Sequence, residues 1–202
     1  MKLVILDRDG TINEDRDDFV KSADEWVPIA GALEAIARLN HAGWHTVIAT
    51  NQSGLARGLL DMARLNAIHA RMNRELAAVG GRIDAIFFCP HGPGDGCDCR
   101  KPLPGLFTRI AERYGVDLHK SPAVGDSLRD IQAGAAAGAL PHLVRTGKCA
   151  GLDAAAVDSL CAQVPGTLVH DDLAAFATHL IVADRQQRGE VDEPDSLFGS
   201  LS

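Results

Sequence analysis

The chain has 202 residues, of which 46% are hydrophobic and 23% are charged, and its formal net charge is -7. This length and composition predict one globular domain with a single core. An acidic chain offers no basic stripe that could bind a phosphate backbone. The net charge therefore excludes nucleic acid as an expected partner and favours a small-molecule partner.

The first ten residues, MKLVILDRDG, contain an apolar run that is interrupted by charge at Asp7. The run is too short for the core of a signal peptide, and no later segment approaches the length of a membrane span. We therefore expect a cytoplasmic protein with no membrane partner. In that reducing compartment, clustered cysteines are more often metal ligands or redox groups than disulfides.

Apolar runs alternate with amphipathic stretches along most of the chain. Strands are predicted, in chain order, at 2–7, 44–51, 84–89, 122–126 and 141–147, with helices between them at 31–43, 60–81, 104–115 and 127–139. A last strand and helix are predicted within 166–180. Continuous apolar strands that alternate with helices are typical of an α/β fold with a doubly wound parallel sheet, which binds ligands at the carboxyl ends of its strands.

We expect one domain over residues 1–184 and no separate cap domain. The segments after the first strand and between the second and third strands have room for loops and a single helix only. The site is therefore expected to be open, which favours a monomer. From Arg185 the sequence RQQRGEVDEPDSLFGSLS loses its periodicity and gains charged and turn residues, so we expect a mobile tail over 185–202.

Four polar motifs follow the first four predicted strands: DRDGT at 7–11, TNQSG at 50–54, RKP at 100–102 and GDSLRD at 125–130. Parallel strands bring their carboxyl ends to one edge of the sheet, so we expect these motifs to converge. Asp7 and Asp9, with Asp126, would form an oxygen cage that suits Mg²⁺, which takes one or two carboxylates plus a substrate phosphate. Lys101 and a hydroxyl on the opposite side would then hold phosphoryl oxygens.

One Asp-x-Asp pair by itself is common in solvated turns, whereas four motifs in this order, each after an apolar run, favour a catalytic site. The small-residue run at 133–139 could suggest a dinucleotide loop. No GxGxxG motif follows the first strand, so we interpret this run as a helix face that packs closely on the sheet.

The two aspartates of DRDGT suit different chemical roles. A carboxylate that attacks phosphorus splits hydrolysis into two displacements through an acyl phosphate, and a second, neutral carboxyl can protonate the leaving oxygen. Asp7 suits the first role, because metal ligation keeps it ionised. Asp9 suits the second role if it binds the metal through its backbone carbonyl, which leaves its side chain free to carry a proton.

Three of the five cysteines lie close together in CPHGPGDGCDC. The potential ligands in this segment are Cys89, His91, Cys97 and Cys99, a Cys₃His set typical of closed, structural zinc sites. The glycine-rich loop has no core of its own, so zinc would order it and present Arg100 and Lys101 to the phosphate pocket. The alternative is a buried Cys89, a surface His91 and a redox pair of the other two thiols. Cys149 and Cys161 have no such neighbours and are interpreted as packing residues or incidental thiols.

Over roughly residues 1–150, DRDGT, TNQSG, RKP and GDSLRD resemble the four ordered motifs of the haloacid dehalogenase superfamily of phosphatases. The resemblance implies a Rossmann-like haloacid dehalogenase fold and a Mg²⁺-dependent phosphoric monoester hydrolase. It implies that Asp7 is the nucleophile and Asp9 the general acid/base. Asp7, the Asp9 carbonyl and Asp126 would bind Mg²⁺, while Thr50 and Lys101 would stabilise the phosphoryl group.

Within the superfamily, the cysteine loop and TNQSGLARG resemble cytosolic sugar-bisphosphate phosphatases of the pathway to the lipopolysaccharide core. The resemblance implies substrate contacts from Asp15, Arg16, Asp17, Asp18, Asn51, Gln52, Ser53 and Arg100. Arg57 and Arg100 are the best-placed cations for a distal phosphate, although Arg57 has the alternative interpretation of a solvated surface arginine. The sequence departs from some relatives in its shorter loop before Cys97 and in Ser127, where they carry a lysine.

Two other functions stay open. The first is histidinol-phosphate phosphatase activity, since that enzyme shares the motifs and a similar zinc loop; the ARG sequence at 56–58 counts against it. The second is a non-enzymatic, zinc-ordered binding module in which the aspartates form a solvated edge. Dependence of phosphate release on Mg²⁺ separates an enzyme from a binding module.

Overall fold

The computed structural model describes residues 1–189. Its centre is a six-stranded parallel sheet in the order β3-β2-β1-β4-β5-β6. The strands are β1 (Leu3–Leu6), β2 (His45–Asn51), β3 (Ala85–Cys89), β4 (Pro122–Gly125), β5 (Leu140–Val144) and β6 (Leu168–His170). The helices are α1 (Ala32–His41), α2 (Met62–Ala78), α3 (Gly105–Tyr114), α4 (Leu128–Ala136), α5 (Ala154–Ala162) and α6 (Leu173–Gln187). Three short 3₁₀ helices are η1 (Ala23–Glu25), η2 (Leu118–Lys120) and η3 (Gly147–Cys149). This arrangement confirms the predicted doubly wound α/β fold.

Strand β1 lies between β2 and β4 in the middle of the sheet. Ile5 pairs with Val47 of β2 on one side and with Ala123 of β4 on the other. The chain winds from β1 to β3 in one direction and then crosses to β4 on the far side of β1, so its winding reverses between β1 and β4. At such a reversal the following loops diverge and leave a crevice at the carboxyl ends of the strands, which is where this architecture binds ligands.

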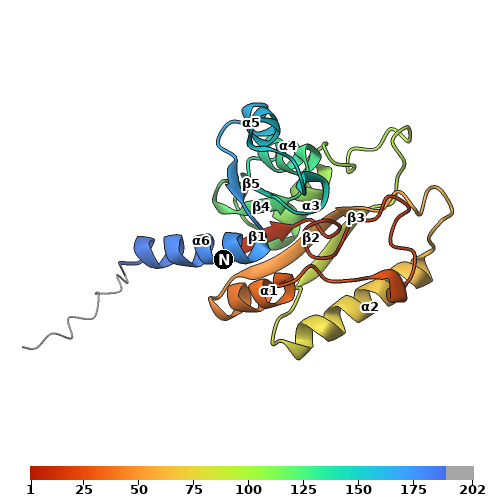
Figure 1. Cartoon of the computed structure of the whole chain (residues 1–202), viewed down its shortest axis with the longest axis horizontal. Helices are drawn as coiled ribbons and strands as arrows, with labels where there is room; N and C mark the ends of the chain where they lie inside the picture. Colours follow the sequence, from red (N-terminus) through yellow and green to blue (C-terminus); the bar gives the residue numbers. More distant parts are fainter. Residues whose placement is uncertain (190–202) are drawn as a thin grey trace, which may run out of the picture.

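Helices cover both faces of the sheet (Figure 1). Helices α1, α2 and α6 pack on one face, where Val4 and Leu6 are buried. Helices α3, α4 and α5 cover the other face, where Leu3 and Ile5 are buried. Because successive residues of β1 enter different clusters, the strand needs an apolar residue at every position, which explains its continuous apolar run.

Two elements differ from the sequence prediction. Helix α5 was not predicted, because Val157 is its single buried residue and its sequence shows no apolar stripe. The sequence feature that could have indicated the start of this helix is its N-cap Asp153, whose side chain accepts a hydrogen bond from the Ala156 N–H. Helix α6 extends to Gln187, and its Asp184 pairs with Lys2 at 2.7 Å. The tail predicted over 185–202 therefore starts with the end of a helix, and residues 190–202 lie outside the described residues.

Residues 1–189 contain no cap domain. The segment between β1 and α1 holds loops and η1, and the segment between β2 and β3 holds a loop and α2. This agrees with the prediction of an open site. Within the same part of the chain, no helix is both long enough and apolar enough to cross a membrane.

Candidate active site

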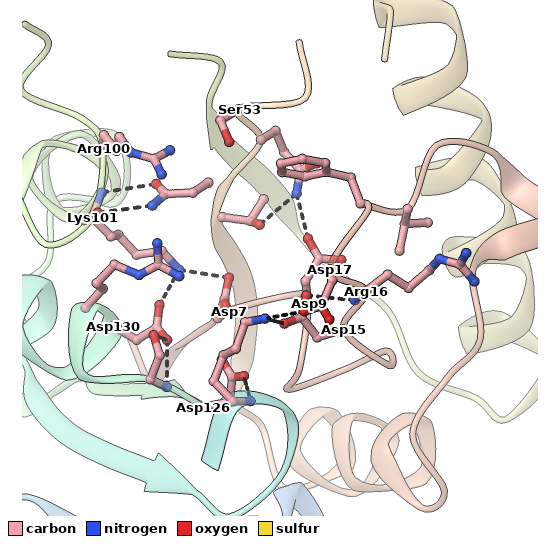
Figure 2. Close-up of a pocket in the computed structure, with 18 of the residues that line it drawn as sticks. Asp7, Asp9, Asp15, Arg16, Asp17, Ser53, Arg100, Lys101, Asp126 and Asp130 are labelled. Carbon is pink, nitrogen blue, oxygen red and sulfur yellow. Dashed lines mark hydrogen bonds and ion pairs between the residues drawn. The ribbon is translucent and has the colours of Figure 1, made fainter. Parts of the chain in front are cut away.

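A hollow of about 260 Å³ lies at the carboxyl ends of β1, β2 and β4 (Figure 2). Its wall contains the predicted residues Asp7, Asp9, Asp15, Arg16, Asp17, Thr50, Asn51, Gln52, Ser53, Arg57, Arg100, Lys101 and Asp126. Asp18 is the exception, because it makes ion pairs with Arg16 and Lys21 and its side chain is 62% exposed. The four sequence motifs therefore converge at the point where the winding of the sheet reverses.

Asp7 is the first residue after β1, and its N–H donates to the Val124 carbonyl of β4 at 2.8 Å. Its side chain is 11% exposed, and Oδ1 lies 2.8 Å from Lys101 Nζ. This buried oxygen accepts no well-directed hydrogen bond within the described part of the chain. Burial raises the pKa of the Asp7 carboxyl to about 7, even though the Lys101 ammonium lowers it. A further cation would be needed to keep Asp7 fully ionised near neutral pH.

Asp126 and Asp130 form a cluster of buried carboxylates with Asp7. One oxygen from each of the three residues lies within 4.8 Å of the others. Asp126 follows β4 and accepts a hydrogen bond from the Lys148 N–H at 2.6 Å, while burial and the two neighbouring carboxylates raise its pKa to about 8. Three carboxylates facing the single ammonium of Lys101 fit a hard divalent cation with oxygen ligands, of which Mg²⁺ is the typical case.

Asp130, which the sequence analysis did not assign, holds Lys101 in place. Its Oδ1 lies 2.6 Å from Lys101 Nζ, which also donates to the Ala49 carbonyl at 2.8 Å. Burial would lower the pKa of Lys101, but Asp130 and Asp7 raise it above its ordinary value. The second oxygen of Asp130 accepts from the Ser127 N–H at 3.0 Å, as part of the capping box of α4, and also from the Ser127 hydroxyl at 2.6 Å. The Ser-x-x-Asp spacing in the sequence could have indicated this capping box. The Ser127 side chain takes part in the cap.

Gly10 lets the DRDGT turn lie directly against Asp126. Its φ is +85°, and a Cβ at this position would overlap Asp126 Oδ2. The Thr146 hydroxyl donates to the Gly10 carbonyl at 2.6 Å and ties the turn to the end of β5. The close approach of the Asp7 and Asp126 carboxylates therefore depends on glycine in the motif.

Asp9 lies beside Asp7, but its side chain is bound differently from the expectation. Arg8, which is fully buried, donates from Nη2 to both Asp9 oxygens at 2.9 Å, and the amides of Asn13 and Gln52 donate at 2.9 and 2.8 Å. Burial would raise the pKa of Asp9, but these donors together hold it below its usual range. The Asp9 side chain is therefore a firmly hydrogen-bonded carboxylate and not the free, readily protonated group that we expected.

The TNQSG motif supports the site from the end of β2. The Asn51 amide donates to the Lys101 carbonyl at 3.1 Å, and Asn51 Oδ1 accepts from the Lys101 N–H at 3.0 Å. Gln52 donates to Thr50 Oγ1 at 3.0 Å as well as to Asp9. Asn51 and Gln52, which were predicted to contact substrate, thus use their amides to hold the Lys101 backbone and the Asp9 and Thr50 side chains.

Both sides of the hollow carry cations and carboxylates. In Figure 2, Arg100, Lys101 and Asp130 lie on one side of Asp7, and the loop with Asp15, Arg16 and Asp17 lies on the other. Asp15 is held by Lys148, whose Nζ lies 2.7 Å from Asp15 Oδ2. Sequence reasoning missed Lys148 and also Arg129, a second cation of the wall. Both residues lie in segments that follow strand ends, and this position was the one sequence feature that could have indicated a place in the site.

Arg57 lines the hollow from the loop after β2. Its guanidinium lies 5.4 Å from the ring centroid of Phe19, within the range of a cation–π interaction. Phe19 itself has a φ of 67°, a left-handed conformation that is uncommon for a residue with a side chain. Arg57 is therefore stacked on the loop that follows Asp15 to Asp18 and differs from a freely solvated arginine.

The thiols and imidazole of the cysteine loop converge on one point. Cys89 Sγ lies 3.7 Å from Cys97 Sγ and 3.5 Å from His91 Nδ1, and Cys99 Sγ lies 3.4 Å from the same nitrogen. All four ligand atoms lie within 4.8 Å of one another, and the cysteines are free thiols. Tetrahedral zinc with its usual bond lengths requires about 3.8 Å between sulfurs and about 3.6 Å between sulfur and nitrogen. The geometry of the loop therefore fits zinc.

Cys149 and Cys161 lie outside this cluster. Cys149 is 1% exposed and is buried with Ile131 and Val157, while Cys161 packs against the same cluster from α5. This confirms the interpretation of both thiols as packing residues.

The comparisons with known proteins agree on one family. A HAD-hydrolase-like family model matches residues 98–176. A D-glycero-β-D-manno-heptose-1,7-bisphosphate 7-phosphatase of Bordetella bronchiseptica is 61% identical over 181 residues, which cover 90% of this chain and 98% of that protein. A Pseudomonas aeruginosa protein of the same name is 53% identical over 180 residues, which cover 89% and 97%. The chain is also similar, with a TM-score of 0.84 and 59% identity, to a crystal structure of the B. bronchiseptica heptose 1,7-bisphosphate phosphatase complexed with magnesium and phosphate; 91% of this chain and 99% of that one are covered.

Proposed function

The chain belongs to the D-glycero-β-D-manno-heptose-1,7-bisphosphate 7-phosphatases, a family of haloacid dehalogenase-like hydrolases, and we propose that it removes the 7-phosphate of that heptose bisphosphate through an aspartyl-phosphate intermediate. The reaction belongs to the synthesis of ADP-heptose for the lipopolysaccharide core. The enzyme is a phosphoric monoester hydrolase.

The position of Asp7 carries this proposal. Its Oδ1 lies at the wall of the hollow, buried, 2.8 Å from Lys101 Nζ and without a well-directed hydrogen bond from the described residues. A carboxylate oxygen with an available lone pair beside a fixed ammonium is suited to attack a phosphorus atom whose oxygens the ammonium contacts. No other aspartate of the hollow combines these features: Asp9 is occupied by Arg8, and Asp126 by the Lys148 N–H.

Asp7, Asp126 and the Asp9 carbonyl are the proposed Mg²⁺ ligands. The fit rests on the three clustered carboxylates, which one ammonium does not neutralise. When bound, Mg²⁺ keeps Asp7 ionised and offsets the repulsion between these carboxylates and the substrate phosphate. The ion pair with Asp130 keeps the Lys101 ammonium beside Asp7.

In the first displacement, Asp7 forms a bond to phosphorus while the bond from phosphorus to the sugar oxygen breaks. Asp9 gives that oxygen a proton. Because Asp9 is held ionised by Arg8, it takes this proton from solvent only when the incoming phosphate dianion raises its pKa. Lys101 and Thr50 hold phosphoryl oxygens. In the second displacement, Asp9 removes a proton from water, which attacks phosphorus and releases Asp7.

We also propose a structural zinc ion at Cys89, His91, Cys97 and Cys99. The support is the match of the three measured separations to tetrahedral coordination. Because Arg100 donates from Nη1 to the His91 carbonyl at 3.2 Å, a zinc-ordered loop would fix the position of this cation beside the hollow. A redox pair of Cys97 and Cys99 would not require the imidazole of His91 to lie 3.5 Å from Cys89 Sγ and 3.4 Å from Cys99 Sγ.

We also propose a cytoplasmic monomer without nucleic-acid or membrane partners; the net charge of -7 supports the absence of a nucleic-acid partner. Free thiols in a closed ligand set are typical of a reducing compartment. The residues that line the hollow all come from one chain, which supports a monomer.

Phosphate release from both anomers of the heptose 1,7-bisphosphate and from histidinol phosphate tests the proposed function. With Mg²⁺ we expect the β-anomer to be hydrolysed with the highest kcat/KM, because the relatives are named for it, and we expect EDTA to abolish turnover. A higher kcat/KM for histidinol phosphate would contradict the substrate assignment. Absence of turnover on every phosphate would favour the binding module.

A further inference from the structure

The active-site hollow adjoins a second hollow beneath the zinc loop. This second hollow has a volume of about 420 Å³ and is lined by Gly92, Pro93, Gly96, Cys97, Arg100, Lys101, Pro102, Leu103 and Arg129. The residues common to the two linings are Arg100, Lys101 and Arg129, all of them cations. No carboxylate belongs to the lining of the second hollow.

The opposite side of the active-site hollow leads to a third hollow with a different charge. Its volume is about 490 Å³, and its lining includes Glu14, Asp15 and Asp17 together with Arg145 and Lys148. The residues that it shares with the active-site hollow are Asp15, Asp17 and Lys148, and Lys148 is already paired with both aspartates at 2.7 and 3.4 Å. The lining of the third hollow therefore has three carboxylates against two cations, whereas the lining of the second has three cations and no carboxylate, so a dianion that extends from the active site is more strongly attracted to the zinc-loop side.

Among the described residues, Arg129 is the cation of the second hollow that is free to bind a phosphate. It lies in the first turn of α4, is exposed, and makes no ion pair with a carboxylate of the described chain. Lys101, by contrast, is bound by Asp7 and Asp130, and Arg100 donates to the His91 carbonyl. An unpaired guanidinium beside a hollow without carboxylates is suited to bidentate binding of phosphate oxygens.

We propose that Arg129, together with Arg100, binds the phosphate that is not transferred and that the substrate extends from Asp7 into the hollow beneath the zinc loop. The proposal rests on the proposed function, because it requires a bisphosphate. It replaces Arg57 as the second cation of the distal site: Arg57 is stacked on Phe19 and does not line the second hollow. Arg129 thus determines specificity for a bisphosphate over a monophosphate and takes no part in the displacements.

The test compares kcat/KM for D-glycero-β-D-manno-heptose 1,7-bisphosphate with kcat/KM for the heptose 7-phosphate, which lacks the distal group. Arg129→Ala should lower the value for the bisphosphate roughly 10- to 100-fold, the range of a lost hydrogen bond to a charged group, and hardly change the value for the monophosphate. Arg129→Lys should give an intermediate loss of kcat/KM for the bisphosphate, because lysine keeps the positive charge but cannot bind two phosphate oxygens at once as a guanidinium does. Arg113→Ala, at an exposed arginine of α3 that lines neither hollow, is the matched control and should change neither value.

Each outcome has one meaning. Equal losses on the two substrates, or no loss on the bisphosphate, would overturn the distal site while leaving the phosphatase assignment intact. Failure of the wild-type protein to hydrolyse either heptose phosphate would overturn the proposed function and the distal site with it. Because Arg129 is exposed and has no ion-pair partner to lose, its alanine variant should keep the wild-type melting temperature, and the kinetic comparison is then free of folding effects.

Discussion

Two clusters of ligand atoms lie at the carboxyl edge of the same sheet, and the chain supports them in different ways. Asp7 and Asp126 directly follow β1 and β4 in the middle of the sheet, and Asp130 lies in the first turn of α4. In the cysteine loop, Cys89 ends β3 and the other three ligands lie on a glycine-rich segment. The carboxylates are thus placed by the fold, whereas most of the thiol cluster has little besides a metal to order it.

The difference has a consequence for what each metal does. Loss of Mg²⁺ should stop the chemistry and leave the fold, because Lys101 and the sheet hold the aspartates. Loss of zinc should loosen a loop and leave the chemistry at Asp7 possible. Variants of the two clusters test this contrast, and variants of a histidine pair outside both clusters provide a comparison.

Asp7→Asn should have the largest effect, a loss of kcat on the order of 10⁴-fold or more, because an amide is not a nucleophile toward phosphorus. The fold should persist, since the substitution keeps the shape and removes one of three mutually repelling carboxylates. Steady-state phosphate release and urea unfolding measure the two effects. Near-wild-type turnover would remove Asp7 from the nucleophile role.

Lys101→Met should lower the free energy of unfolding by about 3–5 kcal/mol, because it leaves Asp7 and Asp130 buried without their cation. Lys2→Met is the matched control: Lys2 pairs with Asp184 at 2.7 Å, but its side chain is 32% exposed, so we expect about 0–1 kcal/mol. Urea unfolding of the two variants measures both values. Equal losses would mean that the carboxylate cluster does not depend on its ammonium.

A buried histidine, His142, pairs with the half-buried His170 outside both clusters, with His142 Nδ1 2.9 Å from His170 Nε2. Burial lowers the pKa of His142 from 6.5 to about 3 and that of His170 to about 4. As the pH falls below 6.5, the unfolded chain binds protons that the folded chain does not, so the free energy of unfolding decreases; at pH 5 His142 alone accounts for about 2 kcal/mol.

Urea unfolding at neutral pH and at pH 5 measures this loss. In His142→Asn the difference between the two pH values should shrink, whereas a His179→Asn variant, at an exposed ring nearby, should keep more of it. An undiminished pH dependence in His142→Asn would show that other groups cause it.

Cys97→Ser should have the smallest effect on global stability and a clear effect on one loop. We expect about one zinc per chain in the wild-type protein and none in the variant, with faster amide exchange over residues 89–101. Cys161→Ser, at a thiol that packs outside the cluster, should keep the zinc. Elemental analysis that finds no zinc in wild-type protein purified without chelator, or a reversible Cys97–Cys99 disulfide, would favour the redox alternative.

Much of this contrast could be predicted from the sequence. The strands were readable because each central strand is buried on both faces and is therefore apolar at successive positions, as in β1. The positions of Asp7 and Asp126 followed, since a polar residue directly after such a strand must lie at the carboxyl edge of the sheet. The Cys₃His spacing was equally direct, because its four ligands share one short loop.

The contacts that depend on how separate elements pack could not be predicted. The pairing of Lys101 with Asp130 requires the loop after β3 to meet the first turn of α4, and no local pattern encodes that approach. The hydrogen bonds from the Arg8 guanidinium that keep Asp9 ionised require a fully buried arginine. Arginine is rarely fully buried in proteins, so no sequence pattern indicated these hydrogen bonds. Arg129 became recognisable only when the two hollows and their linings were known.

The most direct test of the central claim is to find the phosphoryl group on Asp7 itself. A reaction with the heptose 1,7-bisphosphate and Mg²⁺, quenched in acid within a turnover and digested with pepsin, would be examined by mass spectrometry. The account predicts the added mass of one phosphoryl group on the peptide that contains Asp7, and no such mass in Asp7→Asn. A phosphoryl group on another residue, or equal labelling of the two proteins, would contradict it.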